Sequence, residues 1–113
     1  MYLPKEDIYK SLKELDVGLS QSQPTKFNEL PYINFSISNN DVELDLNNDI
    51  LYQTIDVKID IWSKDSVTAS ELLSKVEEKM RKKLYRMTYS ADIPNIGNVY
   101  HIVSRFKAMK GEE

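Results

Sequence analysis

The sequence lacks cysteine, has a single histidine, His101, and contains only three glycines, Gly18, Gly97 and Gly111. Because cysteine is absent, disulfide bonds, thiolate zinc sites and thiol nucleophiles are excluded. One histidine leaves little material for a nucleophilic triad or a histidine-rich metal site. The glycines are isolated, so no glycine-rich loop can cradle a phosphate, and no serine lies in a nucleophile elbow. We therefore expect a protein that is not an enzyme and needs no cofactor or metal ion.

Long hydrophobic runs are also absent. No apolar stretch approaches the roughly 20 residues that span a bilayer, and the first ten residues, MYLPKEDIYK, lack the apolar segment of a secretory signal. We expect a soluble protein that is not exported and does not contact a membrane. With 113 residues, 41% of them hydrophobic and 29% charged, residues 1–113 are expected to form a single domain with one core.

Charge is distributed unevenly along the chain, although the net charge is only −3. Residues 1–65 contain 6 basic and 12 acidic side chains, whereas residues 66–113 contain 9 basic and 6 acidic ones. A protein polarised in this way can join copies of itself, acidic surface to basic surface.

Two amphipathic helices are predicted from the apolar period. The first covers about residues 4–17, with Ile8, Leu12 and Leu15 on one face and Gly18 as its stop. The second covers about residues 68–85. It begins at a capping box formed by Thr68 and Glu71, and its apolar stripe recurs every four residues at Leu72, Val76, Met80 and Leu84.

Alternating segments predict the strands. A polar loop of about twelve residues, 20–31, precedes strands at residues 32–37, 42–46 and 52–62, which the polar segments SNND and NND separate. In the second strand Val42, Leu44 and Leu46 alternate with Glu43 and Asp45, and we expect the apolar residues on the buried face of the sheet. After the second helix we expect the turn IPNIG, a final strand over residues 98–109 and room for a short extra strand near residues 85–89. The predicted fold is therefore α+β, a two-layer sandwich in which two helices cover an antiparallel sheet of about four to five strands. The element order is α-β-β-β-α-β or α-β-β-β-α-β-β.

The third predicted strand places Ile55, Val57, Ile59 and Ile61 on one face and Asp56, Lys58, Asp60 and Trp62 on the other. Asp56 and Asp60 are four residues apart, about 13 Å along a strand, whereas a glycosidase-type carboxylate pair needs about 5–10 Å. We interpret them as a surface ladder with Lys58 between them. Two interpretations of Trp62 stay open: burial by a partner, or packing at the strand end against the entry to the second helix.

The acidic segment DVELDLNND does not fit a calcium loop. With Asp41 at the first position, Leu46 replaces the required glycine and Tyr52 the final acid, and with Asp45 first, Ile50 replaces the glycine. A solvated or interface face is the better interpretation. His101 lies in an alternating strand, and we interpret it as a structural histidine.

The basic segment KMRKKLYR, residues 79–86, has two interpretations. Its charges can complement the dipole at the end of a helix, or they can contact nucleic-acid phosphates. A small nucleic-acid-binding module that uses this segment is the alternative function. Sequence-specific binding is not expected, because no groove-entering module is visible and the chain is acidic overall.

Several segments in this order match a known pattern: PYINFSI, NNDVELDLNND, DIWSK, ELLSKVEEKM and NVYHIVSRF. Across about residues 30–109 the chain resembles the small tail-completion, or head–tail joining, proteins of long-tailed bacteriophages and prophages, which are similar to tail terminators. The most specific matches are DIWS at residues 60–63 and YHxxxRF at residues 100–106. Neither is a catalytic signature.

The resemblance implies a structural virion protein with an α+β fold that assembles as a hexameric ring, caps the tail tube and receives the DNA-filled head. The implied partners are other copies of the chain, the major tail protein and the head-completion or connector proteins. Contact with DNA in the lumen would be transient and non-specific, and no small-molecule substrate is implied. The implied location is the head–tail interface of the virion, after synthesis in the cytoplasm of the bacterial host.

A ring requires one surface to meet a different one on the next copy. From the residues alone we predict no catalytic, cofactor-binding or metal-binding residue. The predicted interface residues are Asp41, Glu43, Asp45, Asp56, Asp60, Trp62, Lys79, Arg81, Lys82, Lys83 and Arg86.

Overall fold

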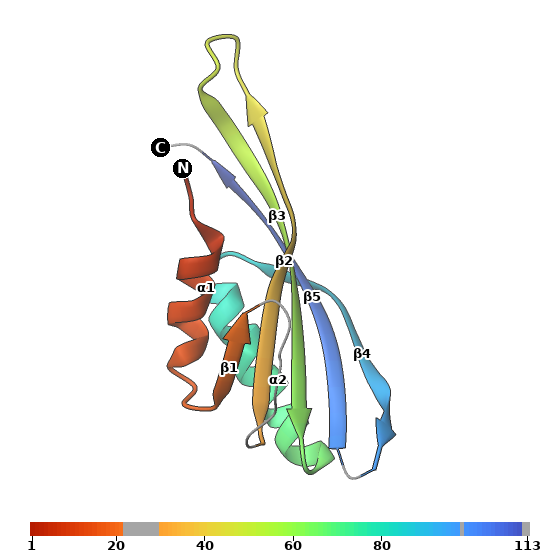
Figure 1. Ribbon diagram of the computed structural model, residues 1–113. Helices are drawn as coiled ribbons and strands as arrows, with labels where there is room; N and C mark the ends of the chain where they lie inside the picture. Colours follow the sequence, from red (N-terminus) through yellow and green to blue (C-terminus); the bar gives the residue numbers. More distant parts are fainter. Residues whose placement is uncertain (22–29, 98, 112–113) are drawn as a thin grey trace.

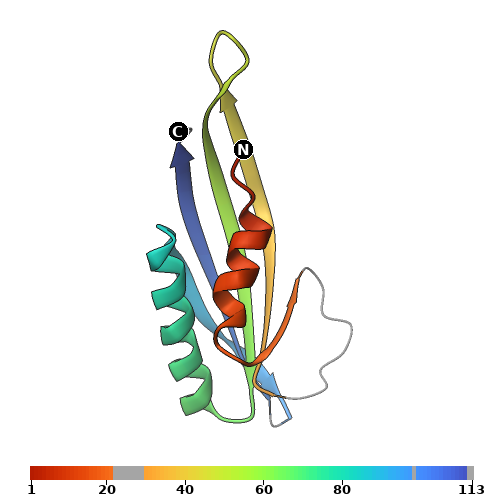
Figure 2. The same ribbon diagram turned by 90° about the vertical axis from the view of Figure 1, so that its left-hand side faces the viewer.

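The computed structural model describes residues 1–21, 30–97 and 99–111. In this part of the chain the elements are α1 (Pro4–Lys13), β1 (Gly18–Gln21), β2 (Tyr32–Leu44), β3 (Ile50–Ser63), α2 (Ser66–Lys82), β4 (Arg86–Ile96) and β5 (Val99–Gly111). Both helices lie on one face of the sheet (Figures 1 and 2). The predicted α+β fold is confirmed, with the order α-β-β-β-α-β-β.

The five strands form one sheet in the order β1-β2-β3-β5-β4. All neighbours are antiparallel except β1 and β2, which are parallel, so the sheet is mixed rather than purely antiparallel. The predicted third strand is β3, and it lies at the centre of the sheet. Its position makes it the strand that both helices can cover.

The core confirms the predicted alternation in β3. Ile55, Val57, Ile59 and Ile61 are all fully buried. They belong to one cluster with the helix residues Ile8, Leu12, Leu72, Val76 and Met80. Because successive side chains of a strand point to opposite faces, the same alternation places Asp56, Lys58, Asp60 and Trp62 on the face away from the helices, which we call the outer face.

The two strands predicted at residues 32–37 and 42–46 are wrong, because they are one continuous strand, β2. The polar segment between them contains a β-bulge, at the register shift between Ile37 and Asn39. One extra residue is accommodated there without ending the pairing, and the Ser38 hydroxyl donates to the carbonyl of Asp56 at 3.1 Å. A polar stretch in a strand therefore marked a bulge rather than a turn.

The start of the predicted loop at residues 20–31 is part of a strand, β1, whereas residues 22–29 lie outside the described residues. Helix α1 ends earlier than predicted, at Lys13, and Asp16 adopts φ 54° in the turn that follows. Gly18 is therefore not the helix stop. It begins β1, where a Cβ atom would lie 2.5 Å from Cδ2 of Tyr32, so glycine permits the close pairing with β2.

Helix α2 begins at a different cap from the predicted one. The Asp65 carboxylate accepts hydrogen bonds from the Thr68 backbone N–H at 2.7 Å and from the Thr68 hydroxyl at 2.9 Å. Thr68 is thus a donor within the first turn, and the predicted capping box is wrong. The bond from the Thr68 backbone amide is the main reason that the pKa of Asp65 lies below its usual value.

The end of α2 also differs from the prediction. The helix ends at Lys82, and Leu84 follows it at φ 68° with 77% of its surface exposed. Leu84 is therefore not part of the buried stripe, and Tyr85 fills the core instead. The extra strand near residues 85–89 is confirmed as β4, which continues to Ile96 and includes most of the predicted turn, so that only Gly97, at φ 68°, remains in the turn.

The molecule is elongated, with extents of 54 × 23 × 22 Å. Much of this length comes from the β2–β3 hairpin, whose far part extends beyond both helices (Figures 1 and 2). We call residues 38–51 the hairpin arm. In the arm, all residues from Ser38 to Asp49 are exposed.

Candidate protein interface

A cluster of aromatic and charged side chains occupies the outer face at one end of β3. Trp62 lies opposite Tyr32 of β2 and His101 of β5. Its indole stacks on the His101 ring at 4.5 Å between centroids, with 16° between the planes, and is tilted by 55° to the Tyr32 ring at 6.3 Å. Directly opposed side chains in an antiparallel sheet are close enough to pack in this way.

Asp60 lies beside this cluster and is only 6% exposed. Its Oδ1 atom is 2.9 Å from Nε2 of His101, and its Oδ2 atom is 3.9 Å from Nζ of Lys58. Asp56 instead accepts a hydrogen bond from the side chain of Asn39 at 3.4 Å. The two aspartates therefore have different partners, and His101 has the structural role predicted for it, as a cross-strand partner of a buried carboxylate.

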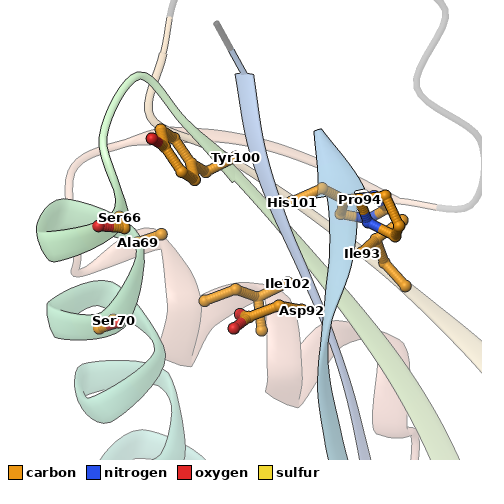
Figure 3. Close-up of a pocket in the computed structure, with 9 residues that line it drawn as sticks. All are labelled: Ser66, Ala69, Ser70, Asp92, Ile93, Pro94, Tyr100, His101 and Ile102. Carbon is orange, nitrogen blue, oxygen red and sulfur yellow. The ribbon is translucent and has the colours of Figure 1, made fainter. Parts of the chain in front are cut away.

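A cavity of about 430 Å³ lies between the start of α2, the end of β4 and the start of β5. Its polar lining includes Ser66, Ser70, Asp92 and Tyr100 (Figure 3). Tyr100 points toward α2, whereas His101 lies on the other side of β5 (Figure 3), where its imidazole bonds to Asp60. The imidazole of His101 is thus directed away from the hydroxyls of Ser66 and Ser70. In a nucleophile–base pair, the imidazole would lie within hydrogen-bond distance of the hydroxyl.

The predicted basic segment is largely neutralised by acidic side chains. Lys79 contacts the carboxylate of Glu14, Lys83 lies 3.0 Å from Asp7, Arg81 3.5 Å from Glu77 and Lys82 3.3 Å from Glu78. The hydrogen bond from Lys79 lowers the pKa of Glu14 below its usual value. Among the residues that the structure describes, only Arg86 of this predicted set lacks an acidic partner. The pairs of Lys79 and Lys83 link α1 to the end of α2, the other two lie within α2, and all four leave less charge for phosphates.

A polar network that sequence reasoning missed joins the N-terminus to the ends of α2 and β5. The Tyr2 hydroxyl donates to Asp7 at 2.7 Å and lies 3.0 Å from the Tyr85 hydroxyl. The ammonium of Lys110 lies 5.0 Å from the Tyr2 ring centroid and 5.1 Å from that of Tyr85. We call Tyr2, Asp7, Lys83, Tyr85 and Lys110 the tyrosine network.

Burial determines most of the ionisation in this network. Burial raises the pKa of Tyr85 to about 12 and raises the pKa of Tyr2 further, and it lowers the pKa of Lys110. Burial alone would also raise the pKa of Asp7, but the hydrogen bonds from Tyr2 and Lys83 hold it below its usual value. At neutral pH both tyrosines are therefore protonated. The Tyr2 hydroxyl stabilises the ionised carboxylate of Asp7, and the Tyr85 hydroxyl contacts that of Tyr2.

The hairpin arm is both acidic and apolar. Its charged residues are all acidic: Asp41, Glu43, Asp45 and Asp49. Its exposed apolar residues are Val42 at 39%, Leu44 at 51%, Leu46 at 103% and Leu51 at 55%. The alternation of valine and leucine predicted a buried strand face, but this prediction is wrong because no helix of the described chain reaches that far along the sheet.

The predicted acidic residues of the arm have different environments. The Asp45 carboxylate forms the hairpin turn, since its Oδ1 atom accepts from the backbone amides of Asn47 at 2.8 Å and Asp49 at 3.0 Å. Asp41 accepts from Asn39 at 2.8 Å on an exposed surface. Glu43 is exposed, opposite Tyr52. The turn explains Asp45, whereas Asp41 and Glu43 face solvent and are available to a partner.

A second hollow, of about 370 Å³, combines basic and apolar side chains. We call it the basic groove. Its lining residues are Thr54, Arg81, Leu84, Tyr85, Arg86, Lys107, Ala108 and Met109. Leu84 and Met109 are 77% and 66% exposed. The first residue of β4, Arg86, pairs with Lys107 of β5. Beyond Lys107, β5 has no β4 neighbour, and the groove lies at this exposed edge of β5.

The predicted interface residues thus fall in separate places rather than in one patch. The arm, the outer-face cluster and the end of α2 each contain some of them. Within residues 1–21, 30–97 and 99–111, no group of three or more histidine, aspartate or glutamate side chains is placed to hold a metal ion. No helix in the described part of the chain is long and apolar enough to cross a membrane.

Comparison with known proteins supports the fold. No family model matches the sequence, and no curated protein matches it. Among solved structures, the chain is similar to a chain in the structure described as the virion of a native gene transfer agent (GTA) particle. The TM-score is 0.57 at 14% sequence identity, and the match covers 93% of this chain and 92% of that one. At this identity the similarity is one of fold, and it extends over nearly the whole of both chains.

Proposed function

We propose that the protein is a structural component of a phage-like virion, and that within it the protein completes the tail and joins it to the DNA-filled head. The observation that carries the proposal is the fold match to a chain of a GTA virion, which spans 93% of this chain. The sequence resemblance to tail-completion proteins, over about residues 30–109, supports the finer role independently of that match.

The surfaces of the molecule are consistent with an assembly protein. Its polar clusters are paired internally, as in Asp60 with His101 and Asp7 with Tyr2. The exposed features are instead an acidic, apolar arm and a basic, apolar groove. Surfaces of this composition are typical of protein contacts. We therefore propose a role in binding other proteins rather than in catalysis.

The proposal is tested by locating the protein in particles. A copy carrying an epitope tag at its C-terminus is expressed in the phage or prophage host, and purified particles are labelled with gold-conjugated antibody. We expect gold at the junction of head and tail. Labelling only in unassembled lysate fractions, with none on particles, would contradict a virion role, and gold along the tail or on the head shell would contradict the joining role alone.

The nucleic-acid alternative is less well supported, because carboxylates neutralise most of the basic segment. Fluorescence anisotropy with labelled duplex DNA at two salt concentrations separates the two functions. A DNA-binding module would bind at low salt and lose affinity steeply as salt rises. We expect no appreciable binding at either concentration.

A further inference from the structure

The hairpin arm presents an apolar face that no helix of its own chain covers. Val42 pairs with Gln53 across β2 and β3, and Gln53 is buried where it bonds to the backbone of Tyr2 on the helix side. Val42 therefore continues the helix-side face of the sheet beyond the helices. The exposed Leu44 and Leu51 follow it at the register shift next to Glu43. Exposed apolar residues on a projecting hairpin are an unfavourable feature unless another surface covers them.

The basic groove carries positive charge, whereas the charges of the arm are all negative. Arg86 and Lys107 are exposed beside Leu84 and Met109, so positive charge and apolar surface occur together. The third cation of the groove, Arg81, has an exposed ion pair with Glu77 at 3.5 Å, which a stronger partner can replace at little cost. The arm has the opposite combination, with only acidic charges among its apolar residues.

The backbone of Leu84 explains why its side chain lies at the surface of the groove. Leucine at φ 68° is in the left-handed region, which is unfavourable for residues with a branched side chain. The conformation places this leucine at the surface, 77% exposed, while its neighbour Tyr85 is buried. The conformation belongs to the C-terminal cap of α2, where the Leu84 amide donates to the Arg81 carbonyl at 2.9 Å and the Tyr85 amide to the Met80 carbonyl at 3.0 Å.

We propose that the hairpin arm of one copy docks in the basic groove of the next copy. Val42, Leu44 and Leu46 then contact Leu84 and Met109, and Asp41 and Glu43 face Arg86 and Lys107. The arm and the groove are different surfaces of the same chain, so the contact is heterologous and each copy keeps one arm and one groove for further neighbours. The inference deepens the proposed function and rests on it only for the place of this contact in the virion.

The absence of cysteine makes this contact measurable by cross-linking. One protein carries Leu46→Cys and the other carries Leu84→Cys, and the two are mixed under mild oxidation. A disulfide forms only where the Cα atoms approach within about 7 Å. We expect a mixed arm–groove dimer on a non-reducing gel. The matched control replaces Leu84→Cys with Val67→Cys, which is 64% exposed in the first turn of α2, at the other end of the molecule (Figure 1).

The mixed dimer should form several-fold faster with Leu84→Cys than with Val67→Cys. Equal rates for the two pairs would overturn the proposal, because they would show only random collision. An arm that captures a different virion protein, with no excess of the Leu84→Cys product, would also overturn it, since the occupant would then not be a second copy.

A charge exchange tests the pairing of the side chains. Asp41→Lys with Glu43→Lys on the arm copy should reduce cross-linking several-fold, and so should Arg86→Glu with Lys107→Glu on the groove copy. Mixing both altered copies should restore it. Circular dichroism checks that each variant is folded. Loss in both single mixtures without recovery in the double mixture would contradict the proposed contact.

These outcomes are separable from the proposed function. If the cross-linking is specific but the protein is absent from particles, the arm–groove contact is supported and the virion role is contradicted. If gold labels the head–tail junction but the cross-linking is not specific, the virion role is supported and the arm–groove contact is contradicted.

Discussion

A carboxylate that is almost fully buried, such as Asp60, depends on its hydrogen-bond partners. At 6% exposure it retains little contact with water, and His101 at 2.9 Å is its principal partner. The stacking of Trp62 on the His101 ring holds the imidazole in this position. The outer-face cluster is therefore expected to stabilise the fold where β3 meets β2 and β5.

We predict that Asp60→Ala lowers the free energy of unfolding by about 1–3 kcal/mol, because the partly buried imidazole of His101 loses its acceptor. Urea unfolding followed by circular dichroism measures the change. Asp60→Asn should cost less, since the amide oxygen can still accept a hydrogen bond. The matched control is Asp56→Ala, on the same face but more exposed, which should have a smaller effect. An equal loss at both positions would contradict a special role for Asp60.

The tyrosine network predicts a loss of stability at alkaline pH. The pKa of Tyr85 is about 12 in the folded protein against an ordinary value of 10.0, because burial disfavours the phenolate. The unfolded state therefore releases its proton first, and stability falls as pH rises from 10 toward 12. In Tyr85→Phe this loss should be shallower.

Thermal unfolding at intervals between pH 9 and pH 12 measures the difference between wild type and Tyr85→Phe. Tyr89→Phe is a matched control, because Tyr89 is 51% exposed and outside the network. Parallel curves for wild type and Tyr85→Phe across this range would show that burial of Tyr85 does not contribute to the pH dependence.

At the scale of elements, the two parts of the β2–β3 hairpin have different roles. Under the helices it contributes Ile55, Val57, Ile59 and Ile61 to the core, all fully buried, whereas the arm has exposed apolar residues such as Leu44 and Leu46. The same hairpin thus provides stability at one end and exposed binding surface at the other.

We predict that Ile59→Ala lowers the free energy of unfolding by about 2–5 kcal/mol, since it leaves a cavity beneath both helices. Leu46→Ser, at a fully exposed position of the arm, should change it by less than about 0.5 kcal/mol. Both are measured by urea unfolding of dilute protein. A large destabilisation by Leu46→Ser would mean that the arm packs within its own chain.

The elements with a regular period are the ones that the sequence predicted well. The alternation in β3 and the four-residue period of α2 arise because one face of each element is buried. The buried positions are apolar, so the pattern is visible in the sequence. The bulge at Ile37 and Asn39 and the left-handed Leu84 were missed, because each depends on backbone geometry that ordinary residues can adopt when packing requires it. The short strand β1 was missed because a four-residue segment has no clear period.

The candidate interface was only partly predictable for a similar reason. The charge polarity of the chain indicated opposite surfaces, and Asp41, Glu43 and Arg86 are indeed exposed. The apolar residues of the arm were interpreted as core, because alternation does not reveal how far a strand extends past its helices. The tyrosine network brings together three segments that are distant in the sequence, and no local sequence pattern indicates such a contact.

At the scale of the whole molecule, the arm and the groove give the chain two different contact surfaces. A heterologous contact repeats from copy to copy and closes into a ring if the rotation allows it. Because acidic and basic residues lie on opposite sides of the proposed contact, association should depend on ionic strength. Electrostatic attraction is screened over about 30 Å at 0.01 M salt and about 3 Å at 1 M salt.

We predict that the sedimentation coefficient of concentrated wild-type protein is larger at low salt than at high salt, and that Glu43→Lys removes the difference. Analytical ultracentrifugation at matched protein concentrations measures it. Association that grows with salt would indicate a purely apolar contact and would contradict the role given to the charges.

The measurement that tests the central claim most directly is electron microscopy of particles made without the protein. The gene is deleted from the phage or prophage and supplied again on a plasmid as a control. We predict filled heads and separate tails with abnormal ends in the deletion, and joined, infectious particles when the wild-type gene is restored. Normal, infectious particles formed in the complete absence of the protein would contradict the account.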